Sequence, residues 1–215
     1  MIELGLLAPR AFAEPGRIFG VVTGVVTNNQ DPDGLGRVKV RFPWLSEDHE
    51  SHWARIAAPM AGDGRGFYTL PEVDDEVLVA FDHGRVDHPF ILGALWNGKD
   101  KPPADNGDGG NNVRVFQSRS GHVIRLDDTD GGEKIEIIDA KGKESLVFDT
   151  AANTITLTAD KDVVIESKSG KVKITGKQGV EITTDGTGKL EAKQGLDLKS
   201  SGGQVNVQGT VINLN

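Results

Sequence analysis

Histidines and acids gather at two places in the first half of the sequence, where they could hold a metal ion. Imidazole and carboxylate groups are common zinc ligands. However, His49 and His52 are three residues apart, whereas the helical zinc-protease motif needs four. We therefore predict a polar loop at 46–51, a hairpin around 84–87 and no metal. The residues concerned are Asp48, His49, Glu50, His52, His83 and His88.

Two short motifs resemble ion-binding or phosphate-binding loops but lack required residues. Asp127, Asp128 and Asp130 precede a Gly-Gly pair, yet the oxygen spacing and the late glutamate of a calcium loop are missing. The run Gly62–Gly66 lacks the Lys-Ser/Thr of a phosphate loop, and no helix follows it. We interpret the first as a solvated hairpin turn and the second as a flexible turn.

Neither enzyme motifs nor a basic surface is evident. The chain has no cysteine, no Gly-x-Ser-x-Gly motif and no recognisable pair of catalytic carboxylates, so we predict a protein that is not an enzyme and needs no cofactor. A basic stripe at Arg37, Lys39 and Arg41 is outweighed by a net charge of −8, which disfavours nucleic-acid binding. Anionic membrane surfaces are disfavoured for the same reason.

The N-terminal region and the apolar runs predict where the protein is made. Glu3 lies where a signal peptide needs positive charge, so we expect synthesis in the cytoplasm without a signal peptide. No apolar run approaches the roughly 18 residues of a membrane-spanning helix, and we expect no stable membrane insertion.

The elements that position these residues are strands, and the two halves of the chain differ in composition. All tryptophans and prolines lie at or before residue 103, and no aromatic residue follows Phe148. In the first half, β-branched or alternating runs predict strands at 18–27, 35–42, 53–60, 76–82 and 89–96. Five short strands with glycine bends favour an all-β protein with an OB-fold barrel at 18–103.

The last third, 153–215, repeats a pair of apolar residues separated by one polar residue. Both members of a pair point to the same face of a strand. The first members step by 8, 9, 8, 10, 6, 9 and 7 residues, which predicts alternating short strands and turns. One chain cannot cover this thin apolar face. The pairs are Ile155/Leu157, Val163/Ile165, Val172/Ile174, Val180/Ile182, Leu190/Ala192, Leu196/Leu198, Val205/Val207 and Ile212/Leu214.

Several motifs of the first half resemble one family in consistent order. They are Asp31-Pro-Asp-Gly-Leu-Gly-Arg-Val-Lys-Val-Arg-Phe-Pro-Trp44, Trp53-Ala-Arg-Ile, Pro59-Met-Ala-Gly-Asp-Gly-Arg-Gly66, Pro71-Glu-Val-Asp-Asp-Glu-Val-Leu-Val-Ala-Phe81 and Leu92-Gly-Ala-Leu-Trp-Asn-Gly98. The chain resembles the phage baseplate assembly protein V/VgrG spike family over about residues 18–103. Ser120–Thr129 and Glu133–Asp139 are similar to the segment that opens the β-helix in VgrG proteins.

The resemblance implies a homotrimer, a spike of a contractile injection system that pierces a target envelope. Its parts are an N-terminal extension (1–17), the OB barrel (18–103), a linker (104–112), a β-hairpin transition (113–152) and a triple-stranded β-helix needle of three intertwined chains (153–215). The expected trimer core comprises Val163, Ile165, Val172, Ile174, Val180, Ile182, Leu196, Leu198, Val205 and Val207. A shared core of three chains covers the apolar face that one chain leaves open.

The same resemblance suggests partners within an assembled phage tail or injection particle. Only about 17 residues precede the barrel, so we expect a separate hub protein at that end, along with tail tube and baseplate proteins. We expect a PAAR-type tip protein at Ile212 and Leu214. An alternative is a carbohydrate-binding tail-fibre or adhesin module.

Overall fold

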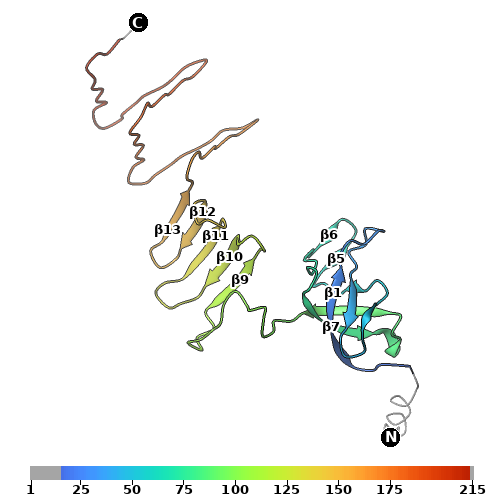
Figure 1. Ribbon diagram of the computed structural model, residues 1–215. Coiled ribbons are helices and arrows are strands. Elements are labelled where there is room, and N and C mark those ends of the chain that lie inside the picture. Colours follow the sequence, from blue (N-terminus) through green and yellow to red (C-terminus); the bar gives the residue numbers. More distant parts are fainter. Residues whose placement is uncertain (1–15, 214–215) are drawn as a thin grey trace, which may run out of the picture. The chain divides into compact units, whose positions relative to one another are not determined.

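The structure is a computed structural model that describes residues 16–213, except for the side chains of Glu47 and Asp48. The chain divides into two units, residues 1–160 and 161–215. The described residues contain thirteen strands and one 3-10 helix, η2 (Asp82–Gly84), which confirms the all-β prediction (Figure 1).

A six-stranded sheet forms the first part of unit 1. Its strand order is β3-β2-β1-β7-β8-β4, and neighbours are antiparallel except β4 and β8, which are parallel. A separate two-stranded hairpin, β5-β6, lies between β4 and β7 in sequence. The bounds are β1 Val21–Asn28, β2 Lys39–Phe42, β3 Ser46–Glu50, β4 Arg55–Ile56, β5 Ala61–Gly62, β6 Arg65–Gly66, β7 Glu76–Phe81 and β8 Pro89–Ala94.

The core of this sheet follows from the period-two alternation of its strands. In β7, every second residue is buried, because successive side chains point to opposite faces of a strand. The same alternation buries Val38, Val40 and Phe42, as the sequence predicted. The phenyl rings of Phe42 and Phe81 lie 5.6 Å apart between centroids. The buried core is Val26, Val38, Val40, Phe42, Ala54, Val77, Val79, Phe81 and Ile91.

Several segments differ from the predicted strands, loops and turns, and the predicted strand at 35–42 is shortened to β2. The predicted polar loop at 46–51 is mostly the strand β3, which pairs Glu50 with Arg41 of β2. Its polar residues gave no alternation signal because β3 is an edge strand with little to bury. The predicted strand at 53–60 is reduced to the two residues of β4. The predicted turn at Gly62–Gly66 is the hairpin β5-β6, where Gly64 has a φ of +61°.

A turn at 31–34, in the connection between β1 and β2, is organised by Asp31. The amide of Gly34 donates to the carbonyl of Asp31 at 3.1 Å, and Gly34 has a φ of +66°. The Asp31 carboxylate accepts the backbone N–H groups of Asp33, Leu35 and Arg37. It also accepts two bonds from the Arg37 guanidinium, at 2.8 and 2.6 Å. This loop is therefore ordered by one charged group.

We expect an Asp31→Asn variant to unfold at a lower temperature than the wild type at pH 7. The Arg37 guanidinium holds the pKa of Asp31 well below its ordinary value of 3.8. A carboxyl with a lowered folded-state pKa stabilises the fold above its unfolded pKa, and this contribution is lost as pH falls. The difference in Tm between the two proteins should therefore shrink below about pH 3.8. Melting curves followed by tryptophan fluorescence at pH 7 and pH 3 measure this; an equal difference at both values contradicts it.

A second sheet forms the rest of unit 1. Residues 104–112, the predicted linker, contain no strand and lead into an antiparallel meander of five strands. The predicted hairpins at 113–152 are present, and Ile155 and Leu157, expected to begin the needle, lie in the last strand of this sheet. The strands are β9 Val113–Gln117, β10 Val123–Asp127, β11 Lys134–Ile138, β12 Ser145–Asp149 and β13 Thr154–Thr158.

Unit 2 is a chain without strands that bends at nearly regular intervals. Residues 161–213 form no strand within the single chain, and no ribbon arrow follows β13 (Figure 1). The backbone bends at 160–161, 168–170, 177–178, 185–186, 193–194, 201–203 and 210. Six segments of six residues each contain no bend, and we call them the straight segments. They are 162–167, 171–176, 179–184, 187–192, 195–200 and 204–209, and their residues are numbered first to sixth below.

Candidate functional site

The histidines of the first half lie on the surface of the barrel domain. His49 and His52 line a small pocket of about 290 Å³ together with Glu50 and Asp87. His49 Nδ1 lies 2.8 Å from the Ser46 hydroxyl. The side chain of Asp48 is outside the described residues. In the part of the chain that the structure describes, no three histidine or acidic side chains are grouped as metal ligands.

His83 and His88 lie in the connection between β7 and β8, on either side of residues 84–87. His83 has a φ of +48° and its side chain is exposed, 3.8 Å from Asp82. His88 lies 3.4 Å from Asp87. The Arg85 guanidinium donates to Asp87 at 3.0 Å and lowers the pKa of that carboxyl. Each histidine thus has an acidic neighbour, in the geometry of an exposed turn.

The basic stripe on β2 is largely neutralised by neighbouring acids. Arg37 is bound by Asp31, and Lys39 forms an ion pair with Glu50 at 3.2 Å. Hydrogen bonds from Thr27 and from Lys39 lower the pKa of Glu50, so it stays ionised at neutral pH. Trp53 lies beneath both cations, 5.9 Å from the Arg37 guanidinium carbon and 5.5 Å from Lys39 Nζ. These cations are occupied within the domain, which leaves little free charge for a phosphate backbone.

The acidic cluster after β10 is a hairpin turn. Asp127 accepts the hydroxyl and the amide of Thr129, and these bonds lower its pKa. Asp128 forms an ion pair with Arg114 at 3.2 Å. The next turn uses the same chemistry at Asp139, whose pKa is lowered to about 2 by the backbone N–H groups that it accepts, chiefly from Glu144. Both clusters order turns between strands.

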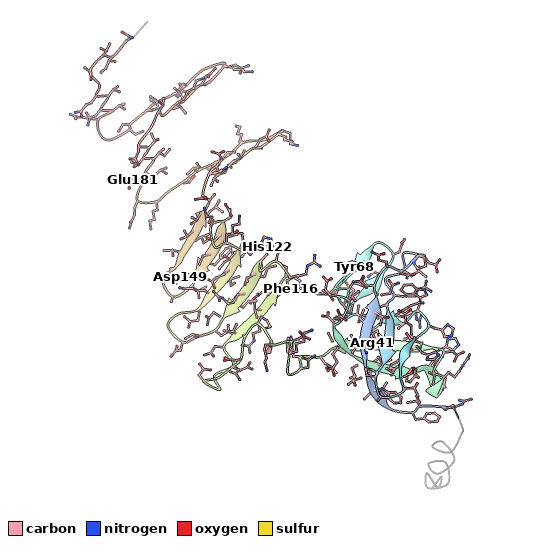
Figure 2. The ribbon with its side chains drawn as sticks, viewed as in Figure 1. Arg41, Tyr68, Phe116, His122, Asp149 and Glu181 are labelled. Atoms are coloured by element: carbon pink, nitrogen blue, oxygen red, sulfur yellow. The ribbon has the colours of Figure 1, made fainter. Side chains whose placement is uncertain are left out.

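A groove of about 1210 Å³ lies on the barrel domain and was not anticipated from the sequence. It is bordered by the β5-β6 hairpin, and its walls carry apolar side chains with one guanidinium, Arg65, and one carboxylate, Asp75. Tyr68, labelled in Figure 2, is 79% exposed. The exposed large apolar residues along the groove are Leu35, Met60, Phe67, Tyr68 and Leu92. This surface offers apolar contact area rather than a constellation of catalytic groups.

The five-stranded sheet has one face that is almost entirely apolar. Register places Ile124 opposite both Phe116 and Ile137, so their side chains lie on one face. Nine apolar side chains make up this face, and seven of them are exposed in the single chain. Phe116, one of the seven, is labelled in Figure 2. The nine are Phe116, Ile124, Leu126, Ile135, Ile137, Leu146, Phe148, Ile155 and Leu157. We call this set the sheet face.

The opposite face of the same sheet mixes half-buried apolar residues, such as Val123 and Val147, with ion pairs. Arg125 Nη2 lies 2.5 Å from Glu136 across β10 and β11. Lys134 lies 3.7 Å from Asp149 across β11 and β12. A sheet with one apolar face that is exposed needs a partner on that side. In the described residues of this chain, no helix or second sheet is packed on that side.

The predicted trimer-core residues of unit 2 are all exposed in the single chain. Their exposed fractions run from 51% to 87%, as expected for side chains that one chain cannot cover. Among residues 161–213, no backbone N–H donates to a backbone carbonyl. Ile212 is 48% exposed, and Leu214 lies outside the described residues. Unit 2 therefore presents both unpartnered apolar side chains and an unpartnered backbone.

The first half of the chain matches one protein-family model. Residues 22–96 match the type VI secretion system/phage-baseplate injector OB domain. The matched range contains nearly all of β1 and the whole of β2 to β8, so the model covers the six-stranded sheet and the β5-β6 hairpin.

Curated relatives extend the similarity beyond this domain. The type VI secretion system spike protein VgrG5 of Pseudomonas aeruginosa is 31% identical over 141 residues, and VgrG4b of that species is 34% identical over 141. Each alignment covers 60% of this chain but only 17% and 16% of the relative. The actin cross-linking toxin VgrG1 of Vibrio cholerae is 27% identical over 188 residues, or 84% of this chain and 16% of the relative. The chain thus spans about a sixth of the length of these relatives.

Fold and comparisons agree on the class of protein. Residues 22–96 are similar in sequence to the type VI secretion system/phage-baseplate injector OB domain, and they fold as an all-β unit, as that match implies. The resemblance to VgrG-type spike proteins that the sequence indicated is thereby confirmed. The described residues include no helix long and apolar enough to span a bilayer.

Sequence reasoning missed the sheet face and the groove. The signal for the sheet face was available, since Ile124/Leu126, Ile135/Ile137 and Leu146/Phe148 are the same alternating pairs that mark the needle. Their predicted role is a transition into the needle, and not a surface. The groove has no comparable signal, because its residues come from separate segments that only the folded domain brings together.

Proposed function

We propose that three copies of this chain form the central spike of a contractile injection machine. In this assembly unit 2 is a triple-stranded β-helix needle, and the protein acts mechanically and not as an enzyme. Its relatives among VgrG spike proteins support this assignment. Sheath contraction would drive the needle through the target envelope.

The observation that carries the proposal is the unpartnered backbone of unit 2. Backbone N–H and C=O groups that are buried in native proteins are almost always paired, and burying the apolar residues of unit 2 would bury its backbone as well. Over residues 161–213 none of them is paired with another backbone group of the same chain, although the backbone is extended and regularly bent. Strand pairing between copies satisfies these groups, and a closed ring of three leaves no free edge.

The apolar side chains support the same assembly. Two residues of most segments are apolar, too few to build a core in one chain. When three chains contribute these residues to one axis, each layer becomes a small closed core. The sheet face of unit 1 has the same composition and the same need for a partner, so we include it in the shared surface.

The oligomeric state tests this proposal. Light scattering on the purified full-length chain should give about three times the monomer mass of 23.0 kDa. A stable monomer at micromolar concentration contradicts the spike. Electron microscopy of the same sample should show a narrow rod attached to a wider head.

A tip partner is a separate part of the proposal. Ile212 continues the apolar series of unit 2, and the family resemblance suggests that a PAAR-type protein covers the layer made by Ile212 and Leu214. Removing the residues from Gly203 onward should abolish binding of such a protein and leave the trimer intact. Unchanged binding by the truncated trimer contradicts this placement.

A further inference from the structure

The six straight segments of unit 2 share one residue pattern when they are aligned by their bends. The fourth residue is apolar in every segment: Ile165, Ile174, Ile182, Leu190, Leu198 and Val207. The second residue is apolar in five of the six: Val163, Val172, Val180, Leu196 and Val205. In the remaining segment, 187–192, the second residue is Gly188. The bends thus pair Leu190 with Gly188, whereas apolar spacing alone pairs it with Ala192.

The exposed fraction of the side chain differs between second and fourth residues, and its value at Leu190 indicates which of the two positions Leu190 holds. The five apolar second residues are 51–56% exposed, and the other fourth residues are 63–87% exposed. Leu190 is 72% exposed, within the range of the fourth residues and outside that of the second. Leu190 is therefore a fourth residue.

The sixth residues give an independent indication about Ala192. They are small in every segment: Ser167, Gly176, Thr184, Ala192, Ser200 and Gly209. Ala192 fits this series of residues next to a bend. Its small apolar side chain is the reason that spacing alone assigned it to a core pair.

Backbone geometry does not explain the glycine at 188. Its φ is not in the left-handed region, and a Cβ added there would meet only Thr184 Cγ2, at 3.6 Å, an ordinary contact. Gly176 is different, because a Cβ there would lie 1.9 Å from the carbonyl oxygen of Gly179. A side chain is therefore sterically possible at 188 within the chain.

We infer that Gly188, and not Ala192, occupies the core position of the fourth segment, where the three-chain core has a gap. This inference rests on the proposed trimer. Three copies of Gly188 face one axis, so this layer lacks the three side chains that Val or Leu supplies in the neighbouring layers. Ala192 lies beside the bend, outside the core.

Lysine substitutions in the full-length chain test the register. Three lysines buried on one axis would repel each other and lose their hydration. We expect Gly188→Lys to abolish the trimer by light scattering, and Ala192→Lys to retain it with an unchanged dissociation temperature. Gly195→Lys is the matched control: an added Cβ there meets nothing within 4 Å, its φ is not left-handed, and it is a first residue. It should retain the trimer.

Gly188→Val tests the gap. Filling it with three apolar side chains should slow dissociation of the trimer in detergent by about tenfold or more. Faster or unchanged dissociation overturns the inference that the core has a gap at Gly188. Loss of the trimer in Ala192→Lys, or its retention in Gly188→Lys, overturns the register. A monomeric wild type refutes the proposed function instead, so the two failures are distinguishable.

Discussion

Replacing both Ile174 and Ile182 by lysine should convert the proposed trimer into a monomer of 23.0 kDa. These are fourth residues of neighbouring segments, 69% and 87% exposed in the single chain. Burying an isoleucine side chain contributes about 1.5–3 kcal/mol, and each substitution removes three of them from the assembly. Lysine in their place adds three uncompensated charges per layer, which costs more than the lost burial. Light scattering gives the mass directly.

A matched double variant controls for charge and for needle position. Val164→Lys combined with Thr175→Lys adds the same charges to the same region of the needle, at a third and a fifth residue. Val164 is 83% exposed, and its side chain points to the opposite face from Val163 and Ile165. This variant should remain trimeric. A monomer from both double variants means that charge, and not core position, decides the assembly.

Ile91→Ala should destabilise the barrel domain by about 2–5 kcal/mol while the trimer persists. The Ile91 side chain is fully buried in the core, and Ile91 is paired with Val79 of β7, so its removal leaves a cavity there. All three tryptophans, Trp44, Trp53 and Trp96, lie in or next to this domain, and no aromatic residue follows Phe148. Tryptophan fluorescence in a denaturant titration therefore reports the barrel, and light scattering reports the needle.

Leu92→Ala provides the comparison, since it removes similar atoms from the next residue of β8. Leu92 is 44% exposed and borders the groove, so its loss should cost less than about 1 kcal/mol. Equal destabilisation by the two variants contradicts the assignment of the core. Dissociation of the Ile91→Ala trimer at the unfolding midpoint of its barrel means that barrel contacts hold the chains together.

The barrel was predictable because its strands bury one face each. In such strands, apolar and polar residues alternate, and the spacing of Val38, Val40 and Phe42 is enough to indicate their common face. Glycine and proline marked the turns in the same way, at Pro32 and Gly34 for example. The edge strand β3 was missed because polar residues on an exposed edge carry no such pattern.

The apolar pairs of unit 2 were equally plain in the sequence, but their position relative to the bends was not. The order of residues shows that two apolar residues recur about every eight positions, and their small number indicates that one chain cannot cover them. It does not show where the chain turns. Around 188–192 the sequence offers Leu190 with Ala192, and the bends at 185–186 and 193–194 select Leu190 with Gly188.

The amino-acid sequence was enough to predict an all-β protein with an OB-type domain, a repeat of short apolar pairs and a resemblance to VgrG-type spikes. The continuous surfaces, which are the sheet face of β9 to β13 and the groove beside the β5-β6 hairpin, became visible in the folded chain. The physical reason is that periodicity records which face of its own strand a residue occupies. Register and chain reversal decide which strands lie beside it, and these depend on contacts between residues far apart in the chain.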